Sequence, residues 1–288
     1  MKTKLKSILL LVCFHTILFA QNQPYQSEKL EKVWEVTGLN VPESVLPVPE
    51  EGILYVSNIG INNPNEKEGK GYISIVSMDG KIKTQKWCEN LNSPKGMAIS
   101  GNKLYVSEVD RIAEIDLKTG KKLSEYPVES AVFLNDIAAA ADGSLYISDS
   151  RTGTVYQLKD GKVSVFIQSD DFPNPNGVIM HKGKLLLGTG NKIVKINLDT
   201  KEIEDYMMNT GGVDGLAMVD QGIVIFSDWP GKVHIMKKGE EKELLLDTSM
   251  MENAKTADFG YIADKKLIYI PTFFENSVVC YKLKLEKK

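Results

Sequence analysis

Arginine is scarce in this sequence, and there is no excess of positive charge. The chain has 288 residues, with 35 lysines and arginines against 38 aspartates and glutamates, and its only arginines are Arg111 and Arg151. The formal net charge of -3 provides no basic surface for nucleic acid or for an anionic membrane. We therefore expect no nucleic-acid partner.

Cysteine is scarce as well, with three residues in the chain. Cys13 lies in an apolar run near the N-terminus, which leaves Cys88 and Cys280 for the rest of the protein. Two separated cysteines do not make a disulfide framework. The sequence leaves two alternatives open, a single disulfide in an oxidising compartment or two buried free thiols.

Several common catalytic and nucleotide-binding motifs are missing. The chain contains no Gly-x-Ser-x-Gly, no His-Glu-x-x-His and no Gly-x-x-x-x-Gly-Lys followed by Ser or Thr. Gly188-Thr189-Gly190 is an isolated fragment with no helix predicted after it. These absences argue against a nucleophile-elbow hydrolase, a zinc protease and a phosphate-loop nucleotide enzyme.

The N-terminal segment has the composition of a secretory signal peptide. Basic residues between Met1 and Lys6 lead into an apolar run, and a cleavage site is predicted after Ala20. The run is short for a membrane span, so we favour a cleaved signal over an uncleaved anchor. We expect residues 1–20 to be this signal and residues 21–288 to form one domain. The mature protein would then be exported, periplasmic or secreted, with no stable membrane insertion.

Short strand-like runs follow, and they repeat. One unit, Phe133 to Ser150, opens with Asn135-Asp136, continues through a strand, turns at Asp142-Gly143 and ends in a second strand. Six copies can be aligned, with equivalent positions at residues 43, 95, 135, 176, 214 and 257. Successive copies are therefore 52, 40, 41, 38 and 43 residues apart. Such a period is typical of β-propeller blades with four short strands.

The predicted fold is an all-β, six-bladed β-propeller with four-stranded blades. The sixth copy ends after its third strand, Ser277 to Leu283, and the segment Lys32 to Val36 can supply the missing outer strand. An open arrangement of several sheets is the alternative. The long first spacing is explained by an insertion from Asn58 to Gly71, which we expect to be a mobile loop at the channel mouth, either a lid or a solvated insertion.

Polar residues open the first strand of each copy, and these strands line the channel of a propeller. The residues concerned are Glu43, Lys95, Asn135, Asp136, Asn176, Asp214 and Asp258. Carboxylate and amide oxygens are donors that calcium prefers. Asn or Asp before Gly, as in Asn176-Gly177 and Asp214-Gly215, is also a common turn former. Recurrence at one repeat position favours a metal site over a set of turns.

Four motifs stand at these positions, namely Glu-Ser-Val at Glu43, Asn-Asp at Asn135, Pro-Asn-Gly at Asn176 and Asp-Gly at Asp214. In these motifs the chain resembles the senescence marker protein family, which includes regucalcin and gluconolactonase. It is also similar to the wider six-bladed, calcium-dependent group that contains diisopropyl fluorophosphatase and paraoxonase. The resemblance covers about residues 32–285.

The resemblance implies a single divalent ion, normally calcium, held by Glu43, Asn176 and Asp214, with Asn135 as a fourth ligand or a substrate contact. It also implies that Asp214 is the general base while the ion polarises the carbonyl of a lactone. This chemistry is sensible, because a metal ion can act as a Lewis acid and stabilise the oxyanion while a carboxylate deprotonates water.

One position departs from the sugar-lactone members, which carry a substrate-binding arginine two residues before the Asn of the Asn-Asp pair. Here that residue is Phe133. A phenyl ring cannot replace a bidentate donor, so the departure disfavours sugar acids and favours a more apolar lactone or ester. The expected substrate-lining residues are Phe133, Asp149, Arg151, Trp229, Asp258 and Phe273.

The expected function is an exported, calcium-dependent hydrolase of a lactone or related ester, with a small-molecule substrate. The alternative is a non-catalytic propeller that binds a protein or glycan partner, in which any metal is structural. The four motifs favour the hydrolase, whereas Phe133 favours the binding module. The sequence leaves open the substrate, the identity of the divalent cation and the oligomeric state.

Overall fold

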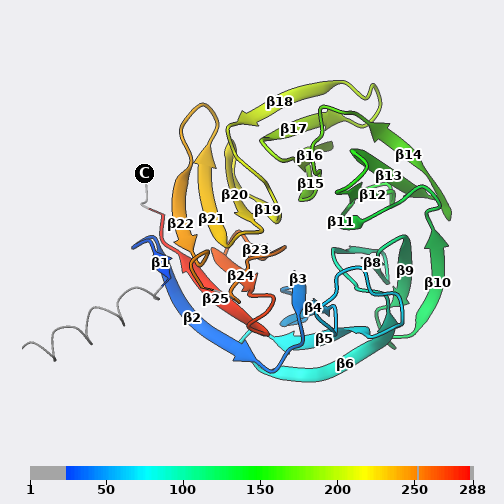
Figure 1. Ribbon diagram of the computed structural model, residues 1–288, viewed down its shortest axis with the longest axis horizontal. Helices are drawn as coiled ribbons and strands as arrows, with labels where there is room; N and C mark the ends of the chain where they lie inside the picture. Colours follow the sequence, from blue (N-terminus) through cyan, green and yellow to red (C-terminus); the bar gives the residue numbers. More distant parts are fainter. Residues whose placement is uncertain (1–23, 252, 286–288) are drawn as a thin grey trace, which may run out of the picture.

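The computed structural model describes residues 24–251 and 253–285. These residues form a six-bladed β-propeller, in which six sheets are arranged as a ring around a central channel (Figure 1). The fold predicted from the repeat period is thereby confirmed. The predicted signal segment, residues 1–20, lies outside the described residues. Within the described part, no helix is long and apolar enough to cross a membrane.

Each blade is an antiparallel sheet with its first strand at the channel (Figure 1). The first three blades are β3 (Pro42–Val48), β4 (Ile53–Asn58), β5 (Gly71–Ser77) and β6 (Ile82–Leu91); β7 (Met97–Ser100), β8 (Lys103–Ser107), β9 (Arg111–Asp116) and β10 (Lys122–Pro127); and β11 (Leu134–Ala139), β12 (Leu145–Asp149), β13 (Thr154–Lys159) and β14 (Lys162–Gln168). The last three are β15 (Val178–His181), β16 (Lys184–Gly188), β17 (Lys192–Asn197) and β18 (Ile203–Met208); β19 (Leu216–Asp220), β20 (Ile223–Asp228), β21 (Lys232–Lys237) and β22 (Glu243–Asp247); and β23 (Gly260–Ile262), β24 (Leu267–Pro271), β25 (Ser277–Leu283) and β2 (Leu30–Thr37).

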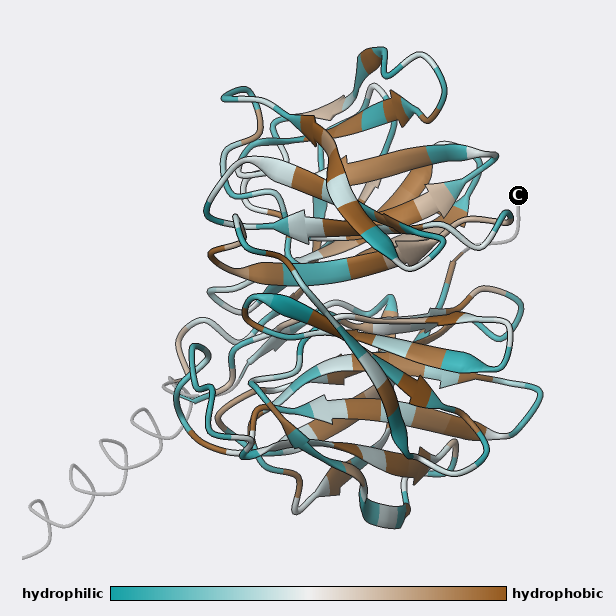
Figure 2. Cartoon of the chain, turned by 90° about the vertical axis from the view of Figure 1, so that its right-hand side faces the viewer, coloured by the Kyte–Doolittle hydropathy of each residue, from teal (hydrophilic) through white to brown (hydrophobic). Residues whose placement is uncertain are grey.

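The repeat unit becomes the inner hairpin of the third blade. β11 pairs with β12, and Ile137 lies opposite Ile147. The connecting turn contains Gly143 with a φ of +87°, a conformation that glycine adopts without steric cost. All five residues of β12 are buried between blades, whereas β14, at the rim, is mostly exposed or half-buried. Hydrophobic residues accordingly follow the strands, and hydrophilic residues gather in the connecting loops (Figure 2).

The ring closes through the strand that the sequence predicted. β2 pairs with β25, with Trp34 opposite Cys280, and so completes the sixth blade. At the channel the N–H of Asp258 donates to the carbonyl of Glu43 at 3.1 Å, which joins the sixth blade to the first. A short strand, β1 (Tyr25–Gln26), adds a fifth strand beside β22. It precedes the first copy of the repeat, so the repeat contained no signal for it.

The hydrophobic core consists of clusters between neighbouring blades. The cluster between the first and second blades, for example, brings Tyr55, Ile73, Leu104 and Ile115 together. Neighbouring clusters of this kind bury apolar area on both faces of each sheet, the main favourable term in folding. Cys88 and Cys280 are both free and buried, the second of the two alternatives left open by the sequence.

Three glycines allow adjacent inner strands to approach each other at the channel. A Cβ on Gly96 would lie 2.5 Å from the Cα of Asp136, one on Gly177 would lie 2.2 Å from the carbonyl oxygen of Asp214, and one on Gly215 would lie 2.8 Å from the N of Phe259. None of the three has a positive φ. These glycines are therefore close-approach residues, and the Asn-Gly and Asp-Gly pairs at the channel are not turns that need a left-handed backbone.

Candidate functional site

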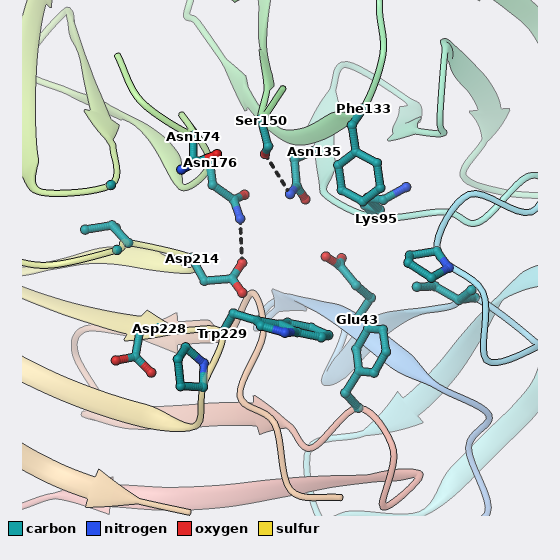
Figure 3. A pocket seen from close by; sticks show the side chains of 17 residues that line it. Glu43, Lys95, Phe133, Asn135, Ser150, Asn174, Asn176, Asp214, Asp228 and Trp229 are labelled. Carbon is teal, nitrogen blue, oxygen red and sulfur yellow. Dashed lines mark hydrogen bonds between the residues drawn. The ribbon is translucent and has the colours of Figure 1, made fainter. Parts of the chain in front are cut away.

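A cavity of about 570 Å³ lies at one end of the channel. Its wall includes five of the residues that open the repeats and three aromatic residues from the loops, namely Glu43, Lys95, Asn135, Asn176, Asp214, Phe133, Trp229 and Phe273. Figure 3 shows the labelled polar side chains arranged around one central space. The structure thus brings the four expected metal ligands to a single cavity, from four different blades.

The amide side chains are oriented by hydrogen bonds from their nitrogens. Asn176 Nδ2 donates to Asp214 Oδ1 at 2.8 Å, and Asn135 Nδ2 donates to Ser150 Oγ at 3.1 Å (Figure 3). The amide nitrogens thus have hydrogen-bond partners, and the amide oxygens remain free to bind a ligand. Glu43 Oε2, Asn135 Oδ1 and Asn176 Oδ1 are all buried without a hydrogen-bond partner.

Unpaired buried oxygens are costly unless something binds them. A hard divalent cation such as calcium takes carboxylate and amide oxygens, so the donor set of Glu43, Asn135, Asn176 and Asp214 fits such an ion. The described residues contain no group of three or more His, Cys, Asp and Glu side chains suited to a metal. A site made of two carboxylates and two amides does not belong to that class.

The carboxylates near the channel strongly affect one another. Burial raises the pKa of Glu43, and the charges of Asp214 and Asp258 raise it further. Burial, with the charge of Asp258, raises the pKa of Asp214 to about 8, against the opposing effect of the hydrogen bond from Asn176. A bound cation would favour the ionised forms, since opposite charge lowers carboxyl pKa values.

Two further carboxylates lie deeper in the channel. Asp136 and Asp258 line a second cavity of about 390 Å³, which is bounded by the inner strands. Asp258 accepts a hydrogen bond from Ser44 Oγ, and burial raises its pKa to about 7. Asp258 was expected to line the substrate site, but it is not among the residues that line the cavity at the mouth.

Asp149, the last residue of β12, and Arg151, in the turn after it, lie beside Phe133. The carboxylate of Asp149 is fully buried and accepts the backbone N–H groups of Val132 at 2.7 Å and Arg151 at 2.9 Å. Asp149 therefore holds the Phe133 loop in place and is not itself a lining residue of the mouth cavity. Arg151, also expected to line the substrate site, is exposed and not among the lining residues of the mouth cavity, and its Cζ lies 4.8 Å from the centre of the Phe133 ring.

An aromatic wall stands on another side of the cavity. The Trp229 and Phe273 rings are 4.6 Å apart and nearly perpendicular, and Phe273 and Phe274 meet in the same way at 4.6 Å. Such edge-to-face contacts are favourable for aromatic quadrupoles. Phe273 is buried, whereas Trp229 remains 43% exposed and lines the cavity. Part of Trp229 is thus free to contact a ligand.

The insertion between β4 and β5 forms another part of the wall. Its residues Ile59 and Pro64 line the cavity. Ser93 Oγ lies 3.0 Å from the carbonyl oxygens of Asn63 and Glu66, which fastens the insertion to the segment before the second blade. The insertion therefore lies at the channel mouth, as the sequence predicted.

Some lining residues were not assigned a role from the sequence. Ser150 orients Asn135, and Asn174 and Asp228 also border the cavity. Lys95 was placed on the ring of strand-opening residues but without a function. The signal that could have singled it out is its repeat position, because the equivalent residues Glu43, Asn135, Asn176 and Asp214 are acidic or amide and Lys95 alone is basic.

The chain matches no protein-family model and no curated protein sequence. Solved structures nevertheless share its fold. A gluconolactonase from Xanthomonas campestris is similar, with a TM-score of 0.64, 15% identity and coverage of 88% of this chain and 89% of that one. A catalytically inactive virginiamycin B lyase from Staphylococcus aureus with quinupristin has a TM-score of 0.60, 15% identity and coverage of 91% and 100%.

A chain of a nidogen–laminin complex is also similar, with a TM-score of 0.60, 15% identity and coverage of 85% of this chain and 90% of that one. Identities this low establish a common fold and no more, because propellers host unrelated functions. The chain is thus a six-bladed β-propeller whose structural neighbours include a gluconolactonase and a streptogramin B lyase.

Proposed function

We propose that this protein is a metal-dependent hydrolase of a lactone or related ester, with a divalent cation, calcium, held by Glu43, Asn135, Asn176 and Asp214. The proposal rests on one observation, the three buried oxygens without partners at the base of an open cavity. A purely structural set of polar residues would be expected to satisfy its own oxygens. The similarity in fold to a gluconolactonase supports the same reaction class.

Each residue has a distinct task in this proposal. A cation held by Glu43, Asn135, Asn176 and Asp214 would supply Lewis-acid chemistry at the carbonyl of the substrate. Asp214 accepts the proton of the attacking water at its carboxylate, and the hydrogen bond from Asn176 to Oδ1 fixes the orientation of that carboxylate. Trp229 and Phe273 cover part of the cavity and exclude bulk water, which strengthens electrostatic interactions inside.

A non-catalytic binding module is the second candidate. The partly exposed ring of Trp229, at the cavity mouth, and the aromatic Phe133 are the residues that favour it. Aromatic side chains of this kind are common in protein and glycan interfaces. A structural neighbour found in a nidogen–laminin complex is compatible with a binding role. In this case the cation would only hold the inner strands together.

Calorimetric titration of calcium into chelator-treated protein, followed by assays on lactones and aryl esters, separates the candidates. We expect one calcium per chain and calcium-dependent hydrolysis. Glu43→Gln should weaken calcium binding by at least about tenfold, because affinity follows the number of ligand charges. Glu51→Gln, at an exposed turn, is the matched control. Binding of calcium without hydrolysis of any ester would favour the binding module, and unchanged affinity in Glu43→Gln would exclude the ligand set.

We also propose that the protein is exported, with residues 1–20 as a cleaved signal. The basic start and the short apolar run support this proposal. The intact mass of the protein from the extracytoplasmic fraction of expressing bacterial cells is the test. A mass that retains the first 20 residues, or accumulation of the full-length chain inside the cells, would contradict it.

A further inference from the structure

Lys95 is a buried cation without a carboxylate partner. It is 1% exposed, and it still borders the mouth cavity. Its Nζ donates one hydrogen bond, to the carbonyl of Ser93 at 3.0 Å. Among the ion pairs of the described residues, none within 4.0 Å includes Lys95. Burying a charge without pairing it is expensive, so a structural role does not explain this lysine.

A second cation, Arg151, contacts the same aromatic ring as Lys95, that of Phe133. Lys95 Nζ is 4.4 Å and Arg151 Cζ is 4.8 Å from the centre of the Phe133 ring. The two charges are therefore no farther apart than the sum of these distances. Arg151 is exposed, and none of the ion pairs recorded within the described residues involves it. Burial lowers the pKa of Lys95 to about 8, the charges of Glu43 and Glu108 oppose this shift, and the charge of Arg151 adds to it.

We propose that Lys95 and Arg151 bind a carboxylate of the substrate at the Phe133 side of the cavity, so that the substrate is an anionic lactone or ester. This inference rests on the proposed function and narrows its substrate class. A carboxylate accepts several hydrogen bonds, and charge-assisted bonds are about twice as strong as neutral ones. Lys95 has two N–H donors beyond the one that Ser93 accepts.

The charge balance of the cavity supports an anion. A bound divalent cation compensates Glu43 and Asp214, the two carboxylates of the proposed ligand set. Lys95 then remains as a positive charge on the lining, and Arg151, which is not itself a lining residue, adds a second positive charge 4.8 Å from the centre of the Phe133 ring. The other lining carboxylate, Asp228, lies far from Lys95 in the cavity (Figure 3). Its Oδ1 already accepts the N–H groups of Gly231 at 3.0 Å and Lys232 at 2.8 Å.

The same view gives the substrate an orientation. Phe133 and Lys95 lie on one side of the cavity, and Trp229 lies across the central space from Phe133 (Figure 3). The carboxylate would lie toward Lys95, the scissile carbonyl over the oxygens of the metal-ligand set, and an apolar part against Trp229. A neutral sugar lactone offers neither the charge nor the apolar part.

Binding of two matched ligands tests the proposal without relying on hydrolysis. The probes are 3-oxocyclopentane-1-carboxylate and its carboxamide, which have the ring size of a lactone but no ester bond. Calorimetry in calcium buffer should give at least about tenfold tighter binding of the carboxylate, the value of one charge-assisted hydrogen bond. In Lys95→Met the preference should disappear, and in Arg151→Gln it should fall by about threefold. Lys118→Met, at an exposed turn, should keep the full preference.

The possible results separate this inference from the proposed function. A carboxylate preference that depends on Lys95 supports the anion subsite even when no ester is hydrolysed. Equal affinities for the two probes in the unsubstituted protein, or no binding of either, would overturn it. So would a preference that persists in both Lys95→Met and Arg151→Gln. Thermal unfolding verifies that each variant is folded, and Lys95→Arg, which keeps the charge, should retain part of the preference.

Discussion

Replacing Asp214 with asparagine gives opposite results with and without calcium, and this reversal is our main prediction. The substitution preserves shape and keeps an oxygen that can accept the hydrogen bond from Asn176 Nδ2. What it removes is one negative charge from a buried group of carboxylates. Without metal, burying that charge destabilises the folded state, whereas with metal the charged carboxylate is a ligand of the cation.

The size of the effect follows from the pKa of Asp214, which burial raises from 3.8 to about 8. The folded state holds a proton that the unfolded state releases between these values. The contribution of protonated Asp214 to stability is therefore complete below pH 4. It falls by about 1.4 kcal/mol per pH unit as the pH rises from 4 and is lost once the pH passes 8. At pH 7 the metal-free variant should be more stable by about 4 kcal/mol. That corresponds to a Tm increase on the order of 10 °C.

Calcium should reverse the order. The unsubstituted protein gains about 4 kcal/mol at a calcium concentration of 1,000 times Kd, whereas Asp214→Asn gains much less. Thermal unfolding in chelator and in calcium at pH 5, 6, 7 and 8 measures both effects. Asp264→Asn, at an exposed position, should track the unsubstituted protein in all eight conditions. The reasoning is refuted when Asp214→Asn melts below the unsubstituted protein in chelator at pH 8, or gains as much from calcium.

Three further substitutions test packing, pH dependence and the apolar wall. Gly177→Ala should lower the free energy of unfolding by at least about 2 kcal/mol and weaken calcium binding, because its Cβ would lie 2.2 Å from the carbonyl oxygen of Asp214. A Cβ on Gly212 would meet no atom within 4 Å, so Gly212→Ala should change the free energy of unfolding much less in denaturant unfolding. Burial lowers the pKa of His234 from 6.5 to about 4. The neutral imidazole therefore contributes fully to stability above pH 6.5, and this contribution is lost as the pH falls toward 4. Over that pH range the free energy of unfolding of His234→Leu should fall by up to about 3 kcal/mol less than that of the unsubstituted protein, as measured by acid unfolding. Trp229→Ala should raise KM for aryl esters about tenfold and leave KM for small lactones nearly unchanged in initial-rate assays.

Most of the fold could be predicted because the period of the repeat is a property of local sequence. Each hairpin is defined by its own turn residues, such as Asp142-Gly143, and six similar hairpins imply six blades. Closure could be predicted as well, since the sixth copy lacks an outer strand and Lys32 to Val36 offers one. The fifth strand of the fifth blade could not, because β1 consists of two residues that belong to no copy.

The site could be predicted only in part. Repeat position brought Glu43, Asn135, Asn176 and Asp214 to one cavity, because equivalent residues of successive blades converge at the channel. It did not distinguish the residues at the mouth from those one layer deeper. Asp258 belongs to the deeper cavity together with Asp136, and each lies one residue after its repeat position, 257 and 135. The prediction treated neighbouring polar residues at a strand start as equivalent, although successive residues of a strand point in opposite directions.

Loop residues were the hardest to assign, because their direction depends on contacts from other segments. Asp149 was expected to face the substrate, but its carboxylate accepts backbone N–H groups of the loop that contains Phe133. The sequence pattern Ser-Asp-Ser does not distinguish these two orientations. Burial distinguishes them, since Asp149 is fully enclosed and has its oxygens occupied.

The contacts of Phe133 in the structure change the class of substrate that we infer. From the sequence, a phenyl ring in place of an arginine indicated a loss of positive charge and a more apolar substrate. In the structure the ring lies against two cations, Lys95 and Arg151, supplied by other segments of the chain. The ring covers a buried charge that has no carboxylate partner, and its polarisable face makes that burial less costly. Positive charge is therefore moved rather than lost, and an anionic substrate is the one that would complete the site.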